Sequence, residues 1–196
     1  MNGHGGVVKI LLERSDVCPN KPDSWGCSPL YFAADCGYDG VVEILLERGD
    51  FNLNEPDDFG RTPLSRASEM GYEGMVKLLL RRDDADPNKS DIWNQTPLLF
   101  AAMNGHAGVV KVLLGRDDTN PNKPNMLNQT PLFYAARNGQ AGVVKMLLEW
   151  GGVNPNQPDQ GGQTLLCCVA GNGREGVVKM VLERGDVNPD SPNEYG

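Results

Sequence analysis

Apolar and polar positions along the chain form two phrases that return at one fixed distance. A Thr-Pro-Leu type phrase recurs every 34 residues, starting at Ser28, Thr62, Thr96, Thr130 and Thr164. A Val-Val type phrase keeps the same step, starting at Val7, Val41, Met75, Val109, Val143 and Val177. A period of this size indicates a stacked repeat array, because one unit is too small to bury its own apolar face. We therefore predict one elongated array.

Each unit predicts two helices followed by a long polar turn. In the third unit Thr96 suits an N-cap, Pro97 suits the first helical position, and Gly105 suits a left-handed C-cap. A second, almost wholly apolar helix is predicted over residues 108–114. Residues 117–124 include two prolines and two asparagines, which favour turns and prevent a helix.

These phrases resemble the ankyrin repeat. The chain follows Gly-x-Thr-Pro-Leu-x-x-Ala-Ala-x-x-Gly-x-x-x-Val-Val-x-x-Leu-Leu and then a turn with Asp and Asn. The resemblance implies an all-α ankyrin-repeat solenoid of stacked antiparallel helix pairs with projecting turns or short hairpins. The tetratricopeptide repeat shares the period, but its short turns leave no room for the polar stretch between Leu114 and Thr130. The 34-residue unit and the phrase Asn-Pro-Asn-Lys-Pro at 120–124 are similar to the ankyrin arrays of large fungal multidomain proteins.

The period divides residues 1–196, taken as a single array, into repeats. We expect a partial repeat with only a second helix over 1–17, and the start of a further repeat over 188–196. Five full repeats are expected between them, over residues 18–51, 52–85, 86–119, 120–153 and 154–187. Neither end has the polar substitutions that normally cap a solenoid, so we expect a segment of a longer array. The alternative is that the apolar ends fray or self-associate.

Arginine and aspartate recur two residues apart at the ends of the second helices. The arginines are Arg14, Arg48, Arg82, Arg116 and Arg184, and the aspartates are Asp16, Asp50, Asp84, Asp118 and Asp186. In the fifth unit both are lost together, becoming Trp150 and Gly152, so we predict that the two positions pair. Exposed pairs of this kind contribute at most about 1 kcal/mol each.

Large apolar residues recur at the tips of the predicted turns, at Trp25, Phe59, Trp93 and Leu127. Aromatic anchors on a polar surface are typical of binding hot spots, and such groups are costly to leave in water. The resemblance implies that the turn tips and first helices line a concave surface that binds a protein partner. Alternatively, each ring packs on the neighbouring turn and stabilises the stack, and both interpretations can hold together.

The ends of the first helices vary more than the rest of each repeat. They are further candidate contacts, namely Asp35, Cys36, Glu69, Met70, Met103, Asn104, Arg137 and Asn138. Such variation is typical of a surface adapted to an irregular partner, and also of unconstrained solvated positions. In the ankyrin family these positions contact partners, which favours recognition.

Composition and charge limit the classes of partner. The chain is 39% hydrophobic and 22% charged, as in soluble folded proteins. Its net charge of −8 argues against nucleic acid or an anionic membrane, since phosphate binding needs clustered Lys and Arg, and favours a basic or mixed-charge protein. The apolar run at 7–12 is too short and too charged for a secretory signal, and no later segment is long enough to span a bilayer. We expect a cytoplasmic or nuclear protein.

No constellation of residues indicates catalysis, a metal or a cofactor. The two histidines, His4 and His106, are not near a Cys or Ser in any arrangement that suits nucleophilic catalysis. The five cysteines occupy five different places in the repeat and lack the spacing of a zinc site. We predict a non-catalytic scaffold for protein interaction. The alternatives are a regulatory or structural spacer within a larger signalling protein, and a small-ligand site in the groove, which lacks any pocket signature.

Overall fold

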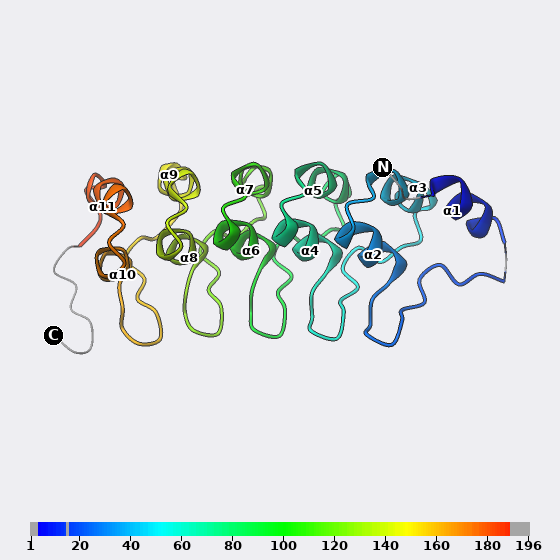
Figure 1. Ribbon diagram of the computed structural model, residues 1–196, viewed down its shortest axis with the longest axis horizontal. Helices are drawn as coiled ribbons and strands as arrows, with labels where there is room; N and C mark the ends of the chain where they lie inside the picture. The colour runs from blue at the N-terminus through cyan, green and yellow to red at the C-terminus, as the bar shows by residue number, and fades with distance from the viewer. Residues whose placement is uncertain (1–3, 15, 189–196) are drawn as a thin grey trace.

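Helices make up all the regular structure of the computed structural model, which describes residues 4–14 and 16–188. Figure 1 shows two rows of helices, with long turns projecting from one side of the stack. The inner row, nearer the turns, consists of α2 (Pro29–Asp35), α4 (Pro63–Met70), α6 (Pro97–Asn104), α8 (Pro131–Arg137) and α10 (Leu165–Gly171). The outer row consists of α1 (Gly5–Leu12), α3 (Asp39–Arg48), α5 (Glu73–Leu79), α7 (Ala107–Leu114), α9 (Ala141–Glu149) and α11 (Glu175–Leu182). The predicted all-α solenoid of helix pairs is confirmed.

The inner helices begin where the sequence predicts. The hydroxyl of Thr96 accepts a hydrogen bond from the Leu99 N–H, and Pro97 occupies the first helical position, where no N–H is needed. The N-caps of the other inner helices accept in the same way, at Ser28, Thr62, Thr130 and Thr164. α6 ends at Gly105, which has a φ of 79° and where a Cβ would lie 2.2 Å from Oε1 of Gln140 in the next repeat. The backbone conformation favours glycine there, whereas the Gln140 side chain is flexible and could move away from a Cβ.

One continuous core runs along the array, because each helix packs mainly on its partner and on the helices of the neighbouring repeats. In α6 every residue from Pro97 to Ala102 is buried, whereas α7 buries one face and leaves Lys111 in solvent. By contrast, α1 buries none of its residues, and Val7 and Ile10 are exposed. We therefore expect stability to be distributed along the stack, with the interior repeats carrying more of it than the ends.

The division into repeats remains a prediction. The second helix expected within the partial repeat 1–17 is present as α1. The expected start of a further repeat over 188–196 lies outside the described residues except for Asn188.

The predicted Arg–Asp pairs form at the outer edge of the stack. Arg116 donates to both carboxylate oxygens of Asp118, at 2.9 and 2.8 Å, and this hydrogen bonding lowers the pKa of Asp118. The other pairs are Arg14–Asp16, Arg48–Asp50, Arg82–Asp84 and Arg184–Asp186. The Arg116 side chain also donates to the main-chain oxygen of Leu80 in the preceding repeat, at 3.2 Å. The same arginine thus pairs with Asp118 and caps the end of α5 in the preceding repeat, so it joins two repeats.

Asparagine side chains make a second set of bridges between repeats. Nδ2 of Asn88 donates to the main-chain oxygen of Asp118 at 2.6 Å, and Oδ1 of Asn88 accepts from the N–H of Asn120 at 2.7 Å. Donor bonds to the start of the following turn are also made by Asn20, Asn54, Asn122 and Asn156. The Asn-Pro-Asn phrase therefore joins consecutive turns as well as shaping them.

Candidate functional site

The turn tips are held rigidly by a carboxylate or amide at the start of each turn. Oδ1 of Asp91 accepts from the N–H groups of Trp93 and Gln95, at 2.9 and 2.8 Å. Asn94 has a φ of 61°, which closes the tip. The same pair of acceptor bonds occurs in the other four turns, at Asp23, Asp57, Asn125 and Asp159. Side chains at the tips therefore stand on a preordered backbone.

Consecutive tips are also joined to one another. The N–H of Ile92 donates to the main-chain oxygen of Phe59 at 2.9 Å, and the N–H of Met126 donates to that of Trp93 at 3.0 Å. Asp58 and Gln160 make the equivalent bonds to the preceding tips. The five tips form one continuous hydrogen-bonded edge, so the side chains on them keep a fixed order along the array.

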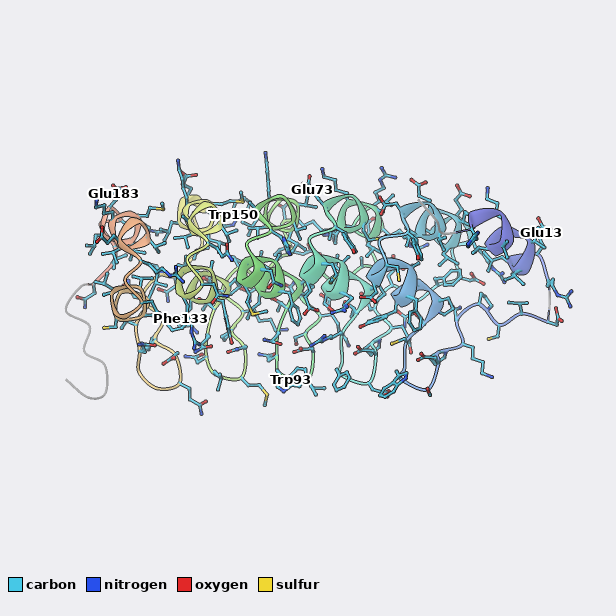
Figure 2. All side chains as sticks on the ribbon, viewed as in Figure 1. Glu13, Glu73, Trp93, Phe133, Trp150 and Glu183 are labelled. Carbon is cyan, nitrogen blue, oxygen red and sulfur yellow. The ribbon has the colours of Figure 1, made fainter. Side chains whose placement is uncertain are left out.

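The four tip residues predicted from the sequence all lie on this edge and remain in solvent. The exposed fractions are 65% for Trp25, 46% for Phe59, 42% for Trp93 and 50% for Leu127. Figure 2 shows Trp93 on the side of the turns, far from the outer helices where Trp150 lies. The rings of Phe59 and Trp93 are stacked, with centroids 6.0 Å apart and planes at 14°. Packing between neighbouring turns therefore occurs for one pair, but it buries none of the four.

Two further residues belong to the same surface and were not among the predicted contacts. Ile92 and Met126 are 54% and 65% exposed at the tips of the third and fourth turns. Their positions hold Ser24 and Asp58 in the first two turns, so no repeated apolar pattern marked them. We call the six residues together the turn-tip strip, which consists of Trp25, Phe59, Ile92, Trp93, Met126 and Leu127.

A cation packs behind the strip. The guanidinium carbon of Arg61 lies 5.9 Å from the ring centroid of Trp93 and 5.5 Å from that of Phe100. Arg61 also pairs with Glu69 at 3.5 Å. Cation–π contacts of this kind contribute about 0.5–1 kcal/mol each at exposed sites. Arg61 therefore contacts Trp93 from the side of α6, so Trp93 packs on both Arg61 and Phe59.

A buried carboxylate lies beneath this centre. Asp91 is 7% exposed, and burial raises its pKa above the ordinary value. Its second oxygen has no hydrogen-bond partner among the described residues. In the second turn the equivalent oxygen of Asp57 accepts from the Tyr31 hydroxyl at 2.8 Å. Ser65 occupies the position of Tyr31 in the next repeat, and its hydroxyl bonds instead to the main-chain oxygen of Thr62.

The predicted contacts at the ends of the first helices are partly used within the stack. Arg66 of α4 donates to Asp35 of α2 and, at 2.7 Å, to Glu69. Burial opposes the charge of Arg66, but these two bonds outweigh it and raise the pKa of the guanidinium. Asn104 donates to the main-chain oxygen of Glu69 at 3.2 Å. The residues that vary at these positions thus make contacts that differ from one pair of neighbouring repeats to the next.

The remaining helix-end residues differ in exposure. Asn138 donates to the main-chain oxygen of Met103 at 2.9 Å, while Cys36, Met70 and Arg137 have exposed side chains. The structure thus brings the predicted helix-end residues together as neighbours along the inner row, beside the turns. Three of them have side chains that join one repeat to the next, namely Asp35, Asn104 and Asn138.

Two further features of the described part of the chain concern its metal-ligating side chains and the length of its helices. Within residues 4–14 and 16–188 no group of three or more His, Cys, Asp or Glu side chains is placed to hold a metal ion. None of the helices there is long and apolar enough to cross a membrane. Cys18, Cys27, Cys36, Cys167 and Cys168 are free thiols.

A row of similar helix pairs with ordered projecting turns defines a helical-repeat protein. The family described as ankyrin repeats (3 copies) matches residues 1–91 and residues 84–159. The chain therefore belongs to the ankyrin-repeat family. Ankyrin repeats are generally protein–protein interaction modules, and the family is generally non-catalytic. A comparison with curated proteins finds no match to this chain.

Proposed function

We propose that this chain is a non-catalytic scaffold that binds a protein partner through the concave surface formed by its turn tips and first helices. The observation that carries the proposal is the turn-tip strip, whose six large apolar residues are 42–65% exposed in four successive repeats. The strip stands on hydrogen-bonded turns, so little conformational entropy is lost when a partner binds. Aromatic anchors of this kind supply most of the affinity in many interfaces.

The alternative of a partner-free spacer accounts for only part of the strip. Stacking between Phe59 and Trp93 stabilises neighbouring turns, as a spacer requires. Trp25 makes no ring contact within the described residues and is 65% exposed, so stacking between neighbouring turns does not explain a tryptophan at this position. Trp25 therefore supports recognition.

The charge of the tips supports a basic or mixed-charge partner. Asp23 and Asp58 are exposed next to Trp25 and Phe59, and the whole chain has a net charge of −8. We accordingly propose a protein partner rather than nucleic acid or a membrane, and a cytoplasmic or nuclear location. The exposed apolar residues of α1, Val7, Ile10 and Leu11, offer a separate surface for self-association.

Capture of partners by the immobilised chain tests the proposal. A variant with Trp25→Ala and Leu127→Ala removes two exposed anchors and spares the stacked pair, so it should fold with an unchanged unfolding midpoint. Trp150→Ala is the matched control, because Trp150 is also exposed (42%) but lies on the side of the outer helices. We expect the wild type and the Trp150→Ala control to capture the same proteins, and the double variant to lose them. Identical capture by all three would contradict the proposal.

A further inference from the structure

We infer that a groove at the α1 end of the stack binds a single helix of a partner protein, which has small residues on its binding face and a glycine at its end. This surface is separate from the turn-tip strip and does not depend on the proposed function. The inference is carried by an outer helix without an inner partner, by the side chains exposed beside it, and by the contacts that inner helices make in the later repeats.

α1 is an outer-row helix that has no inner-row partner among the described residues (Figure 1). Val41 of α3 and Val177 of α11 are buried although they lie in the first and last helix pairs, so residues at this position pack on the inner helix of their own pair. The equivalent residue of α1, Val7, is 55% exposed. Leu11 of α1 is also exposed, whereas the equivalent Leu45 is buried. α1 therefore leaves in solvent the face on which an inner helix packs.

α2 is exposed on the side that in later repeats meets the preceding inner helix. Phe32 is 46% exposed, whereas the equivalent Phe100 of α6, which packs on α4, is 2% exposed. Pro29 is exposed too, while the equivalent prolines are buried, namely Pro63, Pro97 and Pro131. Pro29 and Phe32 line a groove of about 690 Å³ together with Val8 of α1 and Val41 of α3. An inner helix is thus the element whose shape this groove matches.

Inner helices carry small residues on the face that meets the following repeat. One position is exposed in the last inner helix, at Ala170, and buried in the four others, at Ala34, Ser68, Ala102 and Ala136. Because α10 is the last inner helix described, this position faces the following inner helix. A large side chain there would hold two closely packed helices apart. The helix that fits the groove therefore has a small residue at this position.

The end of an inner helix is covered by a side chain of the following repeat. A Cβ on Gly71, which follows α4, would lie 2.6 Å from Nδ1 of His106. Tyr72 approaches Gly37 in the same way, since a Cβ there would lie 3.2 Å from its ring. Tyr38 occupies the equivalent position in the first helix pair, where it lines the groove and is exposed. A partner helix that ends in glycine would let Tyr38 pack on its last turn.

The groove accepts one helix rather than a helix pair. α10 of a second copy has a free face at Ala170, but α10 is paired with α11. Placing α10 in the groove would bring α11 to the position that α1 already occupies beside α3. A single helix leaves α1 in place and buries its exposed apolar face. We therefore assign the occupant to a partner protein and not to a second copy of this chain.

A labelled helical peptide tests the inference. The probe consists of residues 62–72 of this chain, because α4 is the helix that packs on Phe100 in the stack. A covalent link between positions 66 and 70 keeps it helical and avoids the binding face, since Arg66 reaches back to α2 and Met70 is exposed. Fluorescence anisotropy with the 196-residue chain should show saturable binding. Ser68→Leu in the peptide should weaken binding about tenfold or more.

Three variants of the chain locate the bound peptide. Phe32→Ala should weaken binding about tenfold or more, as the loss of a central aromatic contact does. Trp150→Ala is the matched control, because its ring is exposed to a similar degree on the side of the outer helices, and it should bind as the wild type does. Cys36→Asn should tighten binding about threefold, because Asn104 and Asn138 at the equivalent position donate to the main chain of the preceding inner helix.

The possible results are distinct from those that test the turn-tip strip. No binding of the linked peptide, equal binding of the Ser68→Leu peptide, or full binding by Phe32→Ala would each overturn the inference. Unchanged binding by Cys36→Asn would overturn the assigned orientation of the helix. A urea midpoint equal to that of the wild type shows that each variant is folded. In sedimentation of the chain alone, a dimer that Phe32→Ala dissociates would assign the groove to a second copy instead.

Discussion

The asparagine bridges predict a stability effect at a residue whose local sequence indicates only a turn former. Asn88 makes two hydrogen bonds to the following turn, to the main-chain oxygen of Asp118 and from the N–H of Asn120. Replacing Asn88 with Ala removes both bonds and leaves the two main-chain groups without their partners. Because Asn88 is outside the apolar core, any large effect of Asn88→Ala on the free energy of unfolding must come from these two hydrogen bonds.

The expected magnitude follows from the two bonds. Each hydrogen bond contributes about 0.5–1.5 kcal/mol net, so their sum is about 1–3 kcal/mol. Water can reach these groups and partly replace the lost partners, which places the expected loss near 1.5 kcal/mol. A surface substitution without such a role changes stability by only about 0.5 kcal/mol or less. For a chain of this size the corresponding fall in Tm is about 3–6 °C.

Urea unfolding followed by circular dichroism measures the change, with two variants as controls. Asn20→Ala alters the same position in the first turn, where the side chain makes only the donor bond. This variant should lose about half as much unfolding free energy as Asn88→Ala. Lys111→Ala alters an exposed outer-helix residue and should be nearly neutral. If Asn88→Ala behaves like Lys111→Ala, the asparagine bridges do not stabilise the stack and the reasoning is wrong.

Three further outcomes are expected. Tyr31→Phe removes a buried bond to the Asp57 carboxylate and should cost about 2 kcal/mol in urea unfolding, whereas a loss below about 0.5 kcal/mol would contradict that bond. The pKa of Asp118 is lower in the folded chain than its unfolded value near 4. The ionised carboxylate therefore adds at most about 1 kcal/mol to the free energy of unfolding above that unfolded pKa, and this contribution is lost as the pH falls through the folded pKa. Asp118→Asn should flatten this part of the curve of stability against pH. Amide hydrogen exchange should be slowest between residues 62 and 148 and fastest in α1, which has no buried residue, and equal protection of α1 would argue against distributed stability.

Interactions between residues close in the sequence determined where the helices begin and end, and these could be read from the sequence. The Thr-Pro start and the glycine stop of the inner helices depend on capping and backbone conformation within a few residues, so the roles of Thr96 and Gly105 follow from the sequence alone. The 34-residue period then required stacking, because a helix pair alone cannot bury its apolar face. The pairing of Arg116 with Asp118 was also predictable, since the two residues are close in sequence and are replaced together in the fifth repeat.

Contacts between repeats could be decided only by the tertiary structure. The bonds of Asn88 to the next turn and of Arg116 to Leu80 join residues 30 or more positions apart, and no local preference encodes them. Likewise, the sequence placed Trp93 at a tip, but only the fold shows that it stacks on Phe59 and packs on Arg61 while staying 42% exposed. The sequence alone determined which residues occupy the turn tips, because turn chemistry is local. Whether those residues are buried or left for a partner depends on how closely neighbouring repeats approach, which only the assembled stack determines.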